Sequence, residues 1–285
     1  MGRAVLISGL LPYESGKTYF TTSLAKALKS LGYEVAVLKP VAAHSIWYQL
    51  KVFRNSLRLG VLVGEDVLKY INVGLITDPD LQNPIDILTA VPDVTKFTNI
   101  DSYLSAIESA ISQAVLARVS FTVRRYFLAE DVLRNLTPKL REEVRKSLST
   151  FSPVVRVSSS WLTSYLSSRE VDAAIRHAAE SLLQKADIVL IESFSSALLP
   201  TASLAPYVNV LVVVAPSRAM VYSGSKLSTY VSAIKSVNEL DSRLFARILR
   251  PDAVVEVLPS EDWPPPPLEH EAVSPILKLL SLEKY

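Results

Sequence analysis

The sequence contains no cysteine and only three histidines, and this scarcity excludes several kinds of site. A chain without cysteine forms no disulfide, no thiolate metal site and no cysteine nucleophile. The histidines, His44, His177 and His270, are too scattered to give the spacing of a metal site. We expect them to be exposed or to have ordinary hydrogen-bond partners. Chemistry based on thiolates or on a histidine-bound metal is therefore not expected.

Long apolar runs and a strong excess of one charge are also missing. Residues 193–217 carry no charge, but prolines, serines and threonines interrupt them, and a membrane-spanning helix needs about 20 mainly apolar residues in a row. The net charge is only +2. Residues 118–156 hold nine Lys and Arg against four Asp and Glu, an excess that fits solvated helix faces better than a nucleic-acid-binding surface. We expect a cytoplasmic protein without a secretory signal and without a membrane partner.

What is present is a set of short, dense apolar runs typical of buried parallel strands, in a chain that is 49% hydrophobic. The predicted strands are residues 3–8, 34–40, 186–192, 208–215 and 253–259. Helical spacing follows the first of these from residue 18 onward and precedes the third over 169–185. A strand–helix–strand unit this short implies parallel strands with a right-handed crossover. The expected fold class is α/β, with a doubly wound, mainly parallel sheet.

The long middle of the chain predicts helices instead. Residues 101–118 have amphipathic spacing, and 137–148 begin with a Thr-Pro pair suited to a helix start. Near the end, the proline run after Trp263 predicts an extended segment, and 268–282 predict a closing helix. We therefore expect one domain spanning 1–285, with a mostly helical insertion around 95–180.

The stretch "GLLPYESGKTYF" resembles a phosphate-binding loop. In such a loop, backbone N–H groups at a helix N-terminus surround a phosphate, the lysine of Gly-Lys-Thr adds a positive charge, and the hydroxyl after it binds Mg²⁺. Lys17 and Thr18 follow a predicted strand and open a predicted helix, as these roles require. Leu11 stands where the usual first glycine would be, and we expect Gly9 to supply the required backbone freedom.

Two motifs in the same order resemble dethiobiotin synthetase and its relatives, which belong to the P-loop NTPases. That family has a glycine, five residues and then Gly-Lys-Thr, whereas six residues separate Gly9 from Gly16 here. Its second strand ends in Lys-Pro-Val and a small residue, and this chain has "VAVLKPVAA" at 35–43. The resemblance covers about 1–95 and 180–262. It implies a P-loop NTPase fold and places Lys39 near the substrate and the transferred phosphate.

The resemblance also indicates metal ligands, and it has clear limits. A family aspartate that helps to hold Mg²⁺ matches Asp66, and a carboxylate at the end of a later strand matches Glu192. A carboxylate at the C-terminal end of a parallel strand faces the ligand crevice, so a metal role for Glu192 also follows from the fold. However, Ala43 replaces a serine of the family, and "SFSS" replaces its glycine-rich turn after Glu192. The diamino-acid substrate is therefore not implied.

Together these observations predict a nucleotide site with ATP and Mg²⁺ as cofactors. The nucleotide-binding residues expected are Gly9, Glu14, Ser15, Gly16, Lys17, Thr18 and Tyr19; the metal ligands are Thr18, Asp66 and Glu192; the catalytic residues are Lys17 and Lys39. ATP is the default nucleotide because the chain has no Asn-Lys-x-Asp motif for guanine.

Three functions remain open on this basis. The leading hypothesis is an enzyme that transfers a phosphoryl group from ATP to a small carboxylate or carbamate, with positioning and charge neutralisation as its means. A 5′-hydroxyl polynucleotide kinase is an alternative, because "PYESGKT" is similar to the loop of those proteins, but few aromatic side chains adjoin the basic stretch. The other alternative is an ATP-driven switch acting on a protein partner. Relatives of that family often pair into dimers, so the resemblance also implies a homodimer as one expectation.

Overall fold

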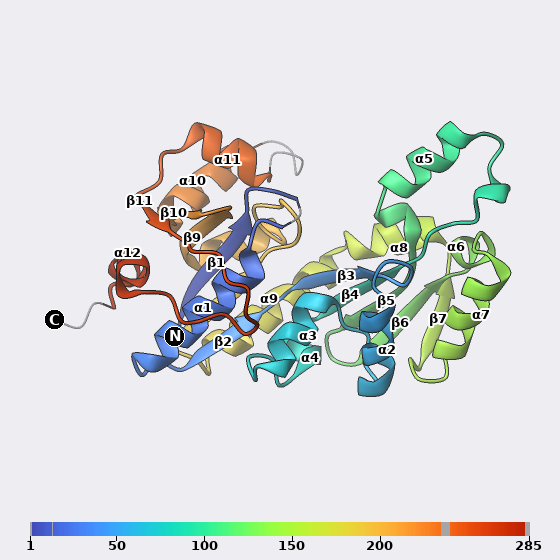
Figure 1. Cartoon of the computed structure of the whole chain (residues 1–285), viewed down its shortest axis with the longest axis horizontal. Coiled ribbons are helices and arrows are strands. Elements are labelled where there is room, and N and C mark those ends of the chain that lie inside the picture. Colours follow the sequence, from blue (N-terminus) through green and yellow to red (C-terminus); the bar gives the residue numbers. More distant parts are fainter. Residues whose placement is uncertain (1, 13, 235–239, 283–285) are drawn as a thin grey trace. The chain divides into compact units, whose positions relative to one another are not determined.

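The computed structural model describes residues 2–12, 14–234 and 240–282. The chain divides into two compact units (Figure 1). Unit 1 comprises Met1–Pro40, Tyr70–Thr77 and Ile175–Tyr285, and unit 2 comprises Val41–Lys69 and Asp78–Ala174. Each unit contains its own β-sheet. The sequence predicts one domain with a mostly helical insertion around 95–180; in the structure, the residues from 41 onward that form unit 2 contain a five-stranded sheet as well as helices.

Unit 1 is built on sheet A, a mixed six-stranded sheet in the order β11-β10-β9-β1-β8-β2. Its strands are β1 (Arg3–Gly9), β2 (Val35–Leu38), β8 (Ile188–Glu192), β9 (Val208–Ala215), β10 (Arg218–Ser223) and β11 (Ala253–Glu256). The pairs β1–β8, β1–β9 and β2–β8 are parallel. Strand β10 is antiparallel to both β9 and β11. The mainly parallel α/β sheet predicted from the apolar runs is thus confirmed, with β10 as an additional strand.

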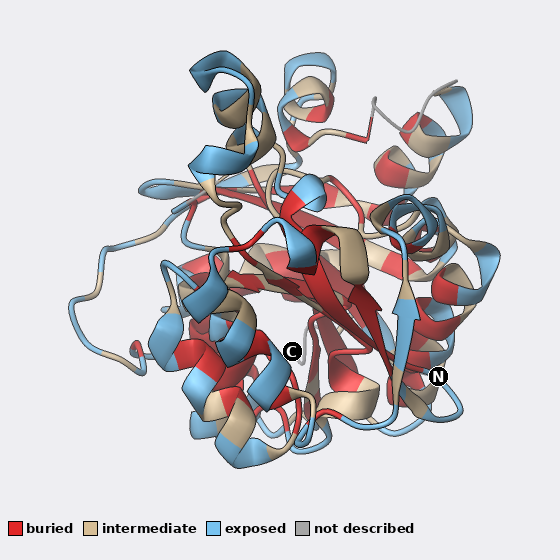
Figure 2. Ribbon diagram, turned by 90° about the vertical axis from the view of Figure 1, so that its right-hand side faces the viewer, coloured by how far each residue is buried: buried red, intermediate tan, exposed pale blue. Residues whose placement is uncertain are grey.

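Burial explains why these runs form central strands. All five residues of β8 and all but Arg3 of β1 are buried, and strands covered on both faces need no alternation of polar and apolar residues. Helix α1 (Lys17–Ser30) packs on β1, β2 and β8, while α12 (His270–Leu280) packs on β9 and on α1. Figure 2 shows this distribution: the strands consist mainly of buried residues, whereas each helix has exposed residues along one side.

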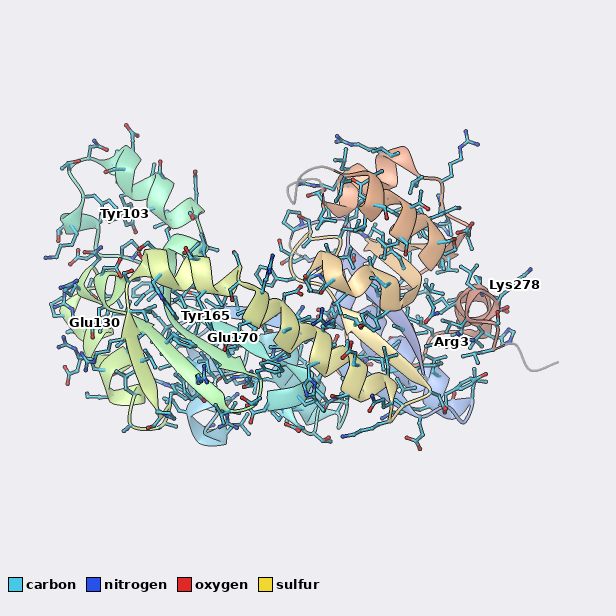
Figure 3. The ribbon with its side chains drawn as sticks, turned by 180° about the vertical axis from the view of Figure 1, so that it is seen from behind. Arg3, Tyr103, Glu130, Tyr165, Glu170 and Lys278 are labelled. Carbon is cyan, nitrogen blue, oxygen red and sulfur yellow. The ribbon has the colours of Figure 1, made fainter. Side chains whose placement is uncertain are left out.

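The remaining helices of unit 1 follow the pattern of the sequence. Helix α9 (Arg169–Leu183) passes from unit 2 into unit 1 and lies in the foreground of Figure 3. Helix α10 (Gly224–Ala233) packs on β9 beside the 3-10 segment η3 (Ala202–Tyr207), and α11 (Ser242–Ile248) follows it. Residues 264–267 form no helix or strand and lie along α1, where Lys26 Nζ donates to the Pro265 carbonyl at 2.7 Å.

Unit 2 contains sheet B, with the strand order β3-β4-β5-β6-β7. Its strands are β3 (Val41–Ser45), β4 (Ile85–Thr89), β5 (Ala114–Ser120), β6 (Arg124–Ala129) and β7 (Val154–Val157). The pairs β3–β4 and β6–β7 are parallel, whereas β5 is antiparallel to both of its neighbours. Its helices are α2 (Leu50–Leu59), α3 (Glu65–Asn72, which ends in unit 1), α4 (Pro79–Gln82), α5 (Ile100–Glu108), α6 (Glu130–Arg134), α7 (Pro138–Ser147) and α8 (Ser159–Leu166), with 3-10 segments η1 (Val94–Lys96) and η2 (Ile111–Gln113).

The helix predicted over 101–118 is only half correct. Helix α5 ends at Glu108, and β5 begins at Ala114. All seven residues of β5 are buried between β4 and β6. A short apolar run fits either period, so tertiary pairing decides its structure. The helix predicted over 137–148 is confirmed as α7, and its Glu142–Lys146 pair forms at 3.0 Å.

Two further expectations concern membrane spans and the histidines. Among the helices of the described residues, none is both long and apolar enough to cross a membrane. His44, expected to be exposed or hydrogen-bonded, is buried in β3 with its Nδ1 3.1 Å from Asp86 Oδ1, and this contact lacks the geometry of a hydrogen bond.

Candidate nucleotide site

The loop between β1 and α1 has the backbone form that its glycines allow. Strand β1 ends at Gly9, and the N–H of Leu10 donates to the Val214 carbonyl of β9 at 2.8 Å. Gly16 precedes α1 with a φ of 85°, a left-handed conformation that favours glycine. Leu11 is 39% exposed, so its side chain does not fill the loop.

Gly9 was expected to supply backbone freedom, but its φ is not positive, and what it provides instead is a close approach of side chains. A Cβ placed on Gly9 would lie 2.4 Å from Ser15 Oγ and 2.6 Å from Lys17 Nζ. The Lys17 ammonium is therefore folded back over the end of β1, where it also lies 3.2 Å from Ser15 Oγ. Only a residue without a side chain at position 9 permits this arrangement. Gly9, Ser15 and Lys17 thus form one cradle at the N-terminus of α1, with a positive charge at its centre.

A second cluster forms around the carboxylate of Glu192, at the C-terminal end of β8. Thr18 Oγ1 donates to Glu192 Oε1 at 3.2 Å, and Lys39 Nζ donates to the same oxygen at 2.5 Å. The hydroxyl of Tyr70, on the part of α3 that belongs to unit 1, donates to Glu192 Oε2. The structure therefore brings three predicted site residues, Thr18, Lys39 and Glu192, into direct contact.

The Lys39–Glu192 pair is almost completely shielded from water. The exposed fractions of the two side chains are 2% and 0%. Lys39 Nζ donates a further hydrogen bond to the Ser193 carbonyl at 3.1 Å. A buried charge is tolerated only when it is paired and hydrogen-bonded, and both conditions are met here. A buried pair of an acidic and a basic side chain thus lies where β1, β2 and β8 end.

The segment after β8 closes over the Lys17 side of the loop. Lys17 Nζ donates to the Ser195 carbonyl at 2.9 Å, and Ser195 has a φ of 51°, which is uncommon for a residue with a side chain. The next residue ties this segment to α11, because the Ser242 N–H and hydroxyl both donate to the Ser196 carbonyl at 3.0 Å. Lys17 is thereby connected through "SFSS" to the start of α11.

The remaining predicted residues are Asp66, Glu14 and Tyr19. Asp66 is in the first turn of α3, in the part of the helix that belongs to unit 2, whereas Tyr70 belongs to unit 1. Glu14 is exposed and has a φ of 52°. Tyr19 is half-buried, and its ring meets that of Trp263 edge-on at 5.2 Å. Among the described residues, no group of three or more acidic or histidine side chains could hold a metal by itself.

Sequence reasoning missed two participants. Tyr70 lies in the same "GEDVLKY" stretch that drew attention to Asp66, but nothing in the pattern indicates that its hydroxyl reaches a carboxylate 122 residues away. Ser195 acts through its backbone carbonyl, which no side-chain motif can reveal. Ser195 closely follows the predicted strand 186–192, which is a signal of its place, whereas Tyr70 follows no predicted strand.

Several basic residues of the stretch 118–156 are paired with acidic residues of unit 2. Arg124 forms an ion pair with Asp80, Arg125 with Glu170 and Arg156 with Glu130. Arg118 is fully buried, and its guanidinium donates to the Leu62 and Asn83 carbonyls. Burial lowers the pKa of Arg118, although nearby Asp86 and Asp80 oppose this shift. Matched charges of this kind do not form the unpaired basic surface that a phosphate backbone requires.

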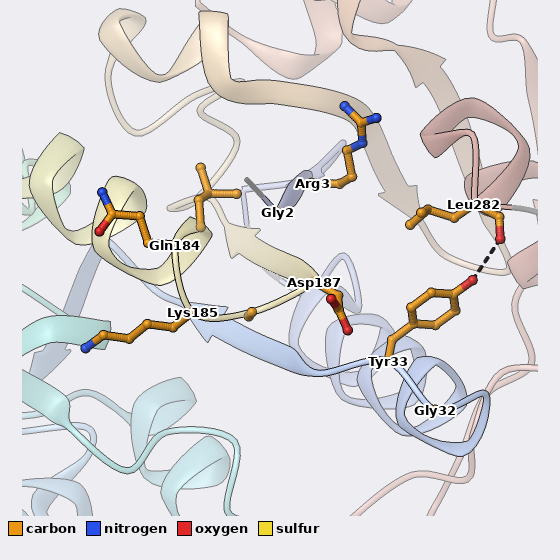
Figure 4. Close-up of a pocket in the computed structure, with 10 residues that line it drawn as sticks. Gly2, Arg3, Gly32, Tyr33, Gln184, Lys185, Asp187 and Leu282 are labelled. Carbon is orange, nitrogen blue, oxygen red and sulfur yellow. Dashed lines mark hydrogen bonds between the residues drawn. The ribbon is translucent and has the colours of Figure 1, made fainter.

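A cavity of about 570 Å³ lies at the opposite end of sheet A, at the amino ends of its parallel strands (Figure 4). It is lined by Arg3, Tyr33, Gln184, Lys185 and Asp187 among others. Tyr33 closes one side by donating its hydroxyl to the Leu282 carbonyl at 2.8 Å. Asp187 is engaged as well, because its Oδ2 accepts from the Glu34 N–H at 2.9 Å. The cavity is therefore separate from the loop, which follows the carboxyl end of β1. Ligands of parallel sheets bind at the carboxyl ends of strands.

Comparison with protein-family models, with curated proteins and with solved structures gave no match.

Proposed function

We propose that this chain is an ATP-binding P-loop NTPase that uses Mg²⁺. The observation that carries the proposal is the contact between Thr18 and Glu192 beside the Lys17 cradle over Gly9. Strand order supports it: β1 lies between β8 and β9, so the chain leaves β1 on one side toward β2 and later crosses to the other side at β9. Ligands of open α/β sheets bind at the carboxyl ends of strands at such a reversal of direction.

The residues present fit both ligands. Gly9 lets Ser15 Oγ and Lys17 Nζ approach the end of β1, and Lys17 supplies a full positive charge at the N-terminus of α1, where backbone N–H groups also favour phosphate. Mg²⁺ typically takes one or two protein oxygens and completes its shell with phosphates and waters. Thr18 Oγ1 and Glu192 would hold it in that way. The metal would neutralise charge on the phosphates of ATP.

We further propose that the reaction is phosphoryl transfer to a small carboxylate or carbamate, as the resemblance to dethiobiotin synthetase implies. By that resemblance Lys39 would attract such an anion; its ammonium lies at the end of β2, beside Glu192. Glu192 holds that ammonium in place, and Tyr70 in turn fixes Glu192. The arrangement orients a cation and excludes water, so catalysis would rest on positioning and charge neutralisation.

A second candidate is an ATP-driven switch, and the contact between Lys17 and the Ser195 carbonyl favours it. A phosphate bound by Lys17 competes for the ammonium that now holds the "SFSS" segment. Since that segment is hydrogen-bonded to α11 through Ser242, exchange of the partner of Lys17 would be transmitted to α11. The polynucleotide kinase alternative has less support, because three arginines of the basic stretch are paired with acidic residues and Arg118 is buried.

The test is the Mg²⁺ dependence of ADP release from ATP, measured for the intact chain and for Thr18→Ala and Thr18→Ser. We expect Thr18→Ala to lose the response to Mg²⁺ and Thr18→Ser to keep it, because serine retains the hydroxyl. Stimulation by members of a panel of small carboxylates and amines supports the enzyme, and stimulation by a protein partner alone supports the switch. Equal Mg²⁺ responses in the two variants would overturn the metal role of Thr18.

A further inference from the structure

We propose that Trp263 and Tyr19 form the site at which the base of a bound nucleoside triphosphate stacks. This inference rests on the proposed nucleotide-binding function and adds to it the part of the ligand that the phosphate cradle does not contact. The observation that motivates it is the ring contact between Tyr19, one residue after Thr18, and Trp263, from the segment that follows β11. Their ring centroids lie 5.2 Å apart at an interplanar angle of 76°.

The topology brings the segment after β11 to the same edge of sheet A as the phosphate loop. Strand β11 is antiparallel to β10, which is antiparallel to β9, which is parallel to β1. Strand β11 therefore runs parallel to β1, and both end at one edge of the sheet. There the N–H of Val257 donates to the carbonyl of Ser217, which lies just beyond the end of β9. The segment 257–268 begins at this edge.

From this edge the segment lies along α1. Trp263 meets Tyr19 in the first turn, Lys26 Nζ binds the Pro265 carbonyl at 2.7 Å, and the Leu268 N–H donates to the Ser23 carbonyl at 3.2 Å. In Figure 1 this orange-to-red segment crosses α1 before it reaches α12. Four prolines after Trp263 restrict the backbone, so the ring is held in place before a ligand arrives.

The space at the carboxyl ends of β8 and β2 is already occupied. There the buried Lys39–Glu192 pair lies next to Thr18, and this pair suits metal and phosphate rather than a base. A nucleotide anchored by its phosphates at Lys17 would extend its sugar and base past the first turn of α1, where Tyr19 and Trp263 meet. Both residues are half-buried, so each has ring surface within reach of a ligand.

Stacking on aromatic rings would determine how strongly this site distinguishes one base from another. Every nucleobase has a π-face, and stacking on an aromatic ring discriminates weakly among bases. A site that relies on Trp263 should therefore bind ATP and GTP with similar affinity, in agreement with a chain that lacks the Asn-Lys-x-Asp motif for guanine. Removal of one stacking ring should weaken nucleotide binding by about fivefold to 150-fold.

The experiment compares a ligand with a base and a ligand without one. Calorimetric titrations of the full chain use Mg-ATP, Mg-GTP and Mg-tripolyphosphate. For Trp263→Ala we expect weaker binding of ATP and GTP in the stated range and unchanged binding of tripolyphosphate, with affinity restored by Trp263→Phe. The matched control is Trp161→Ala, which removes a ring of 44% exposure in unit 2 and should change nothing.

A second measurement uses fluorescence, because the chain has only three tryptophans. In a Trp47→Phe/Trp161→Phe background, Trp263 is the single reporter, and we expect ATP but not tripolyphosphate to change its emission. Unchanged ATP affinity in Trp263→Ala, or equal weakening of ATP and tripolyphosphate, would overturn base stacking while leaving the phosphate site intact. Failure of wild type to bind either ligand would overturn the nucleotide site itself, and stacking with it.

Discussion

Lys39 Nζ lies 2.5 Å from Glu192 Oε1, and both side chains are almost completely buried. A pair of this kind contributes little when compared with apolar residues, but removal of one partner leaves a buried charge without compensation. We therefore expect Lys39→Met to lower the free energy of unfolding of unit 1 by about 3–5 kcal/mol, measured by urea denaturation.

The matched control is Lys146→Met. Lys146 also pairs with a glutamate, Glu142, at 3.0 Å, but both side chains are about two-thirds exposed. Exposed pairs are screened by water and salt, so this substitution should have little effect. If the two variants unfolded at the same urea concentration, the buried pair would not have the strength that its geometry indicates.

A second prediction concerns two glycines with opposite surroundings. In Gly9→Ala the new Cβ would collide with Ser15 Oγ and Lys17 Nζ, which are flexible side-chain ends. The side chains can move, so stability should change little, but the Lys17 ammonium is displaced. We expect the affinity for Mg-ATP to fall about tenfold or more, as for a weakened charge-assisted contact.

Gly32→Ala should behave in the opposite way. Gly32 has a φ of 88°, and a Cβ added there would meet no atom within 4 Å, so only backbone strain opposes the substitution. We expect a loss of stability of about 1–2 kcal/mol and unchanged nucleotide affinity. Calorimetry and thermal unfolding of both variants check the pair. Loss of affinity in Gly32→Ala alone would contradict the placement of the cradle at Gly9.

The third prediction concerns Tyr70, whose hydroxyl donates to Glu192 Oε2. In Tyr70→Phe the buried carboxylate loses one of its donors, and we expect stability to fall by about 1–3 kcal/mol. Tyr222→Phe is the control. Tyr222, in β10, is as fully buried as Tyr70, but its hydroxyl makes a weak contact, 3.7 Å from the Met220 sulfur. A smaller loss in Tyr70→Phe than in Tyr222→Phe would show that Glu192 does not depend on this donor.

The fourth prediction concerns the acid stability of unit 2. Burial raises the pKa of Asp80, but hydrogen bonds from Arg124 and Ser120 and the charges of Arg118 and Arg124 outweigh it, so the net pKa lies below the ordinary value of 3.8. A depressed pKa contributes stability above the unfolded-state pKa, and this contribution is lost as the pH falls through the folded-state value.

We therefore expect the urea midpoint of unit 2 to fall as the pH is lowered from about 5, and to fall less steeply in Asp80→Asn. The carboxylate is 38% exposed, so solvent screening reduces the size of the effect. Parallel pH profiles for the wild type and the variant would show that Asp80 is not the group responsible.

Much of unit 1 could be predicted from the sequence, because its strands are apolar on both faces. The runs that form β1, β2, β8 and β9 have no other plausible place than a covered parallel sheet. Sheet B could not be predicted in the same way. Its strand β5 has helical spacing as well as strand composition, and it becomes a strand only because β4 and β6 pair with it.

The candidate site was predictable where a motif fixes local geometry. Lys17 and Thr18 follow directly from the loop, and Glu192 follows from its position at the end of a strand. Tyr70 and the Ser195 carbonyl depend on long-range contacts that no local pattern encodes. Trp263 was visible only as the start of a proline run, and its contact with Tyr19 required the course of the chain after β11.

The most direct test of the account is calorimetric binding of Mg-ATP to the intact protein and to Lys17→Ala. Lys17 provides the positive charge at the centre of the cradle, and loss of a charge-assisted contact costs roughly 1.5–3 kcal/mol. We predict binding to the intact protein and a loss of affinity of about ten- to more than a hundredfold in Lys17→Ala. Equal affinity in the two proteins, or no binding to either, would contradict a nucleotide site at this loop.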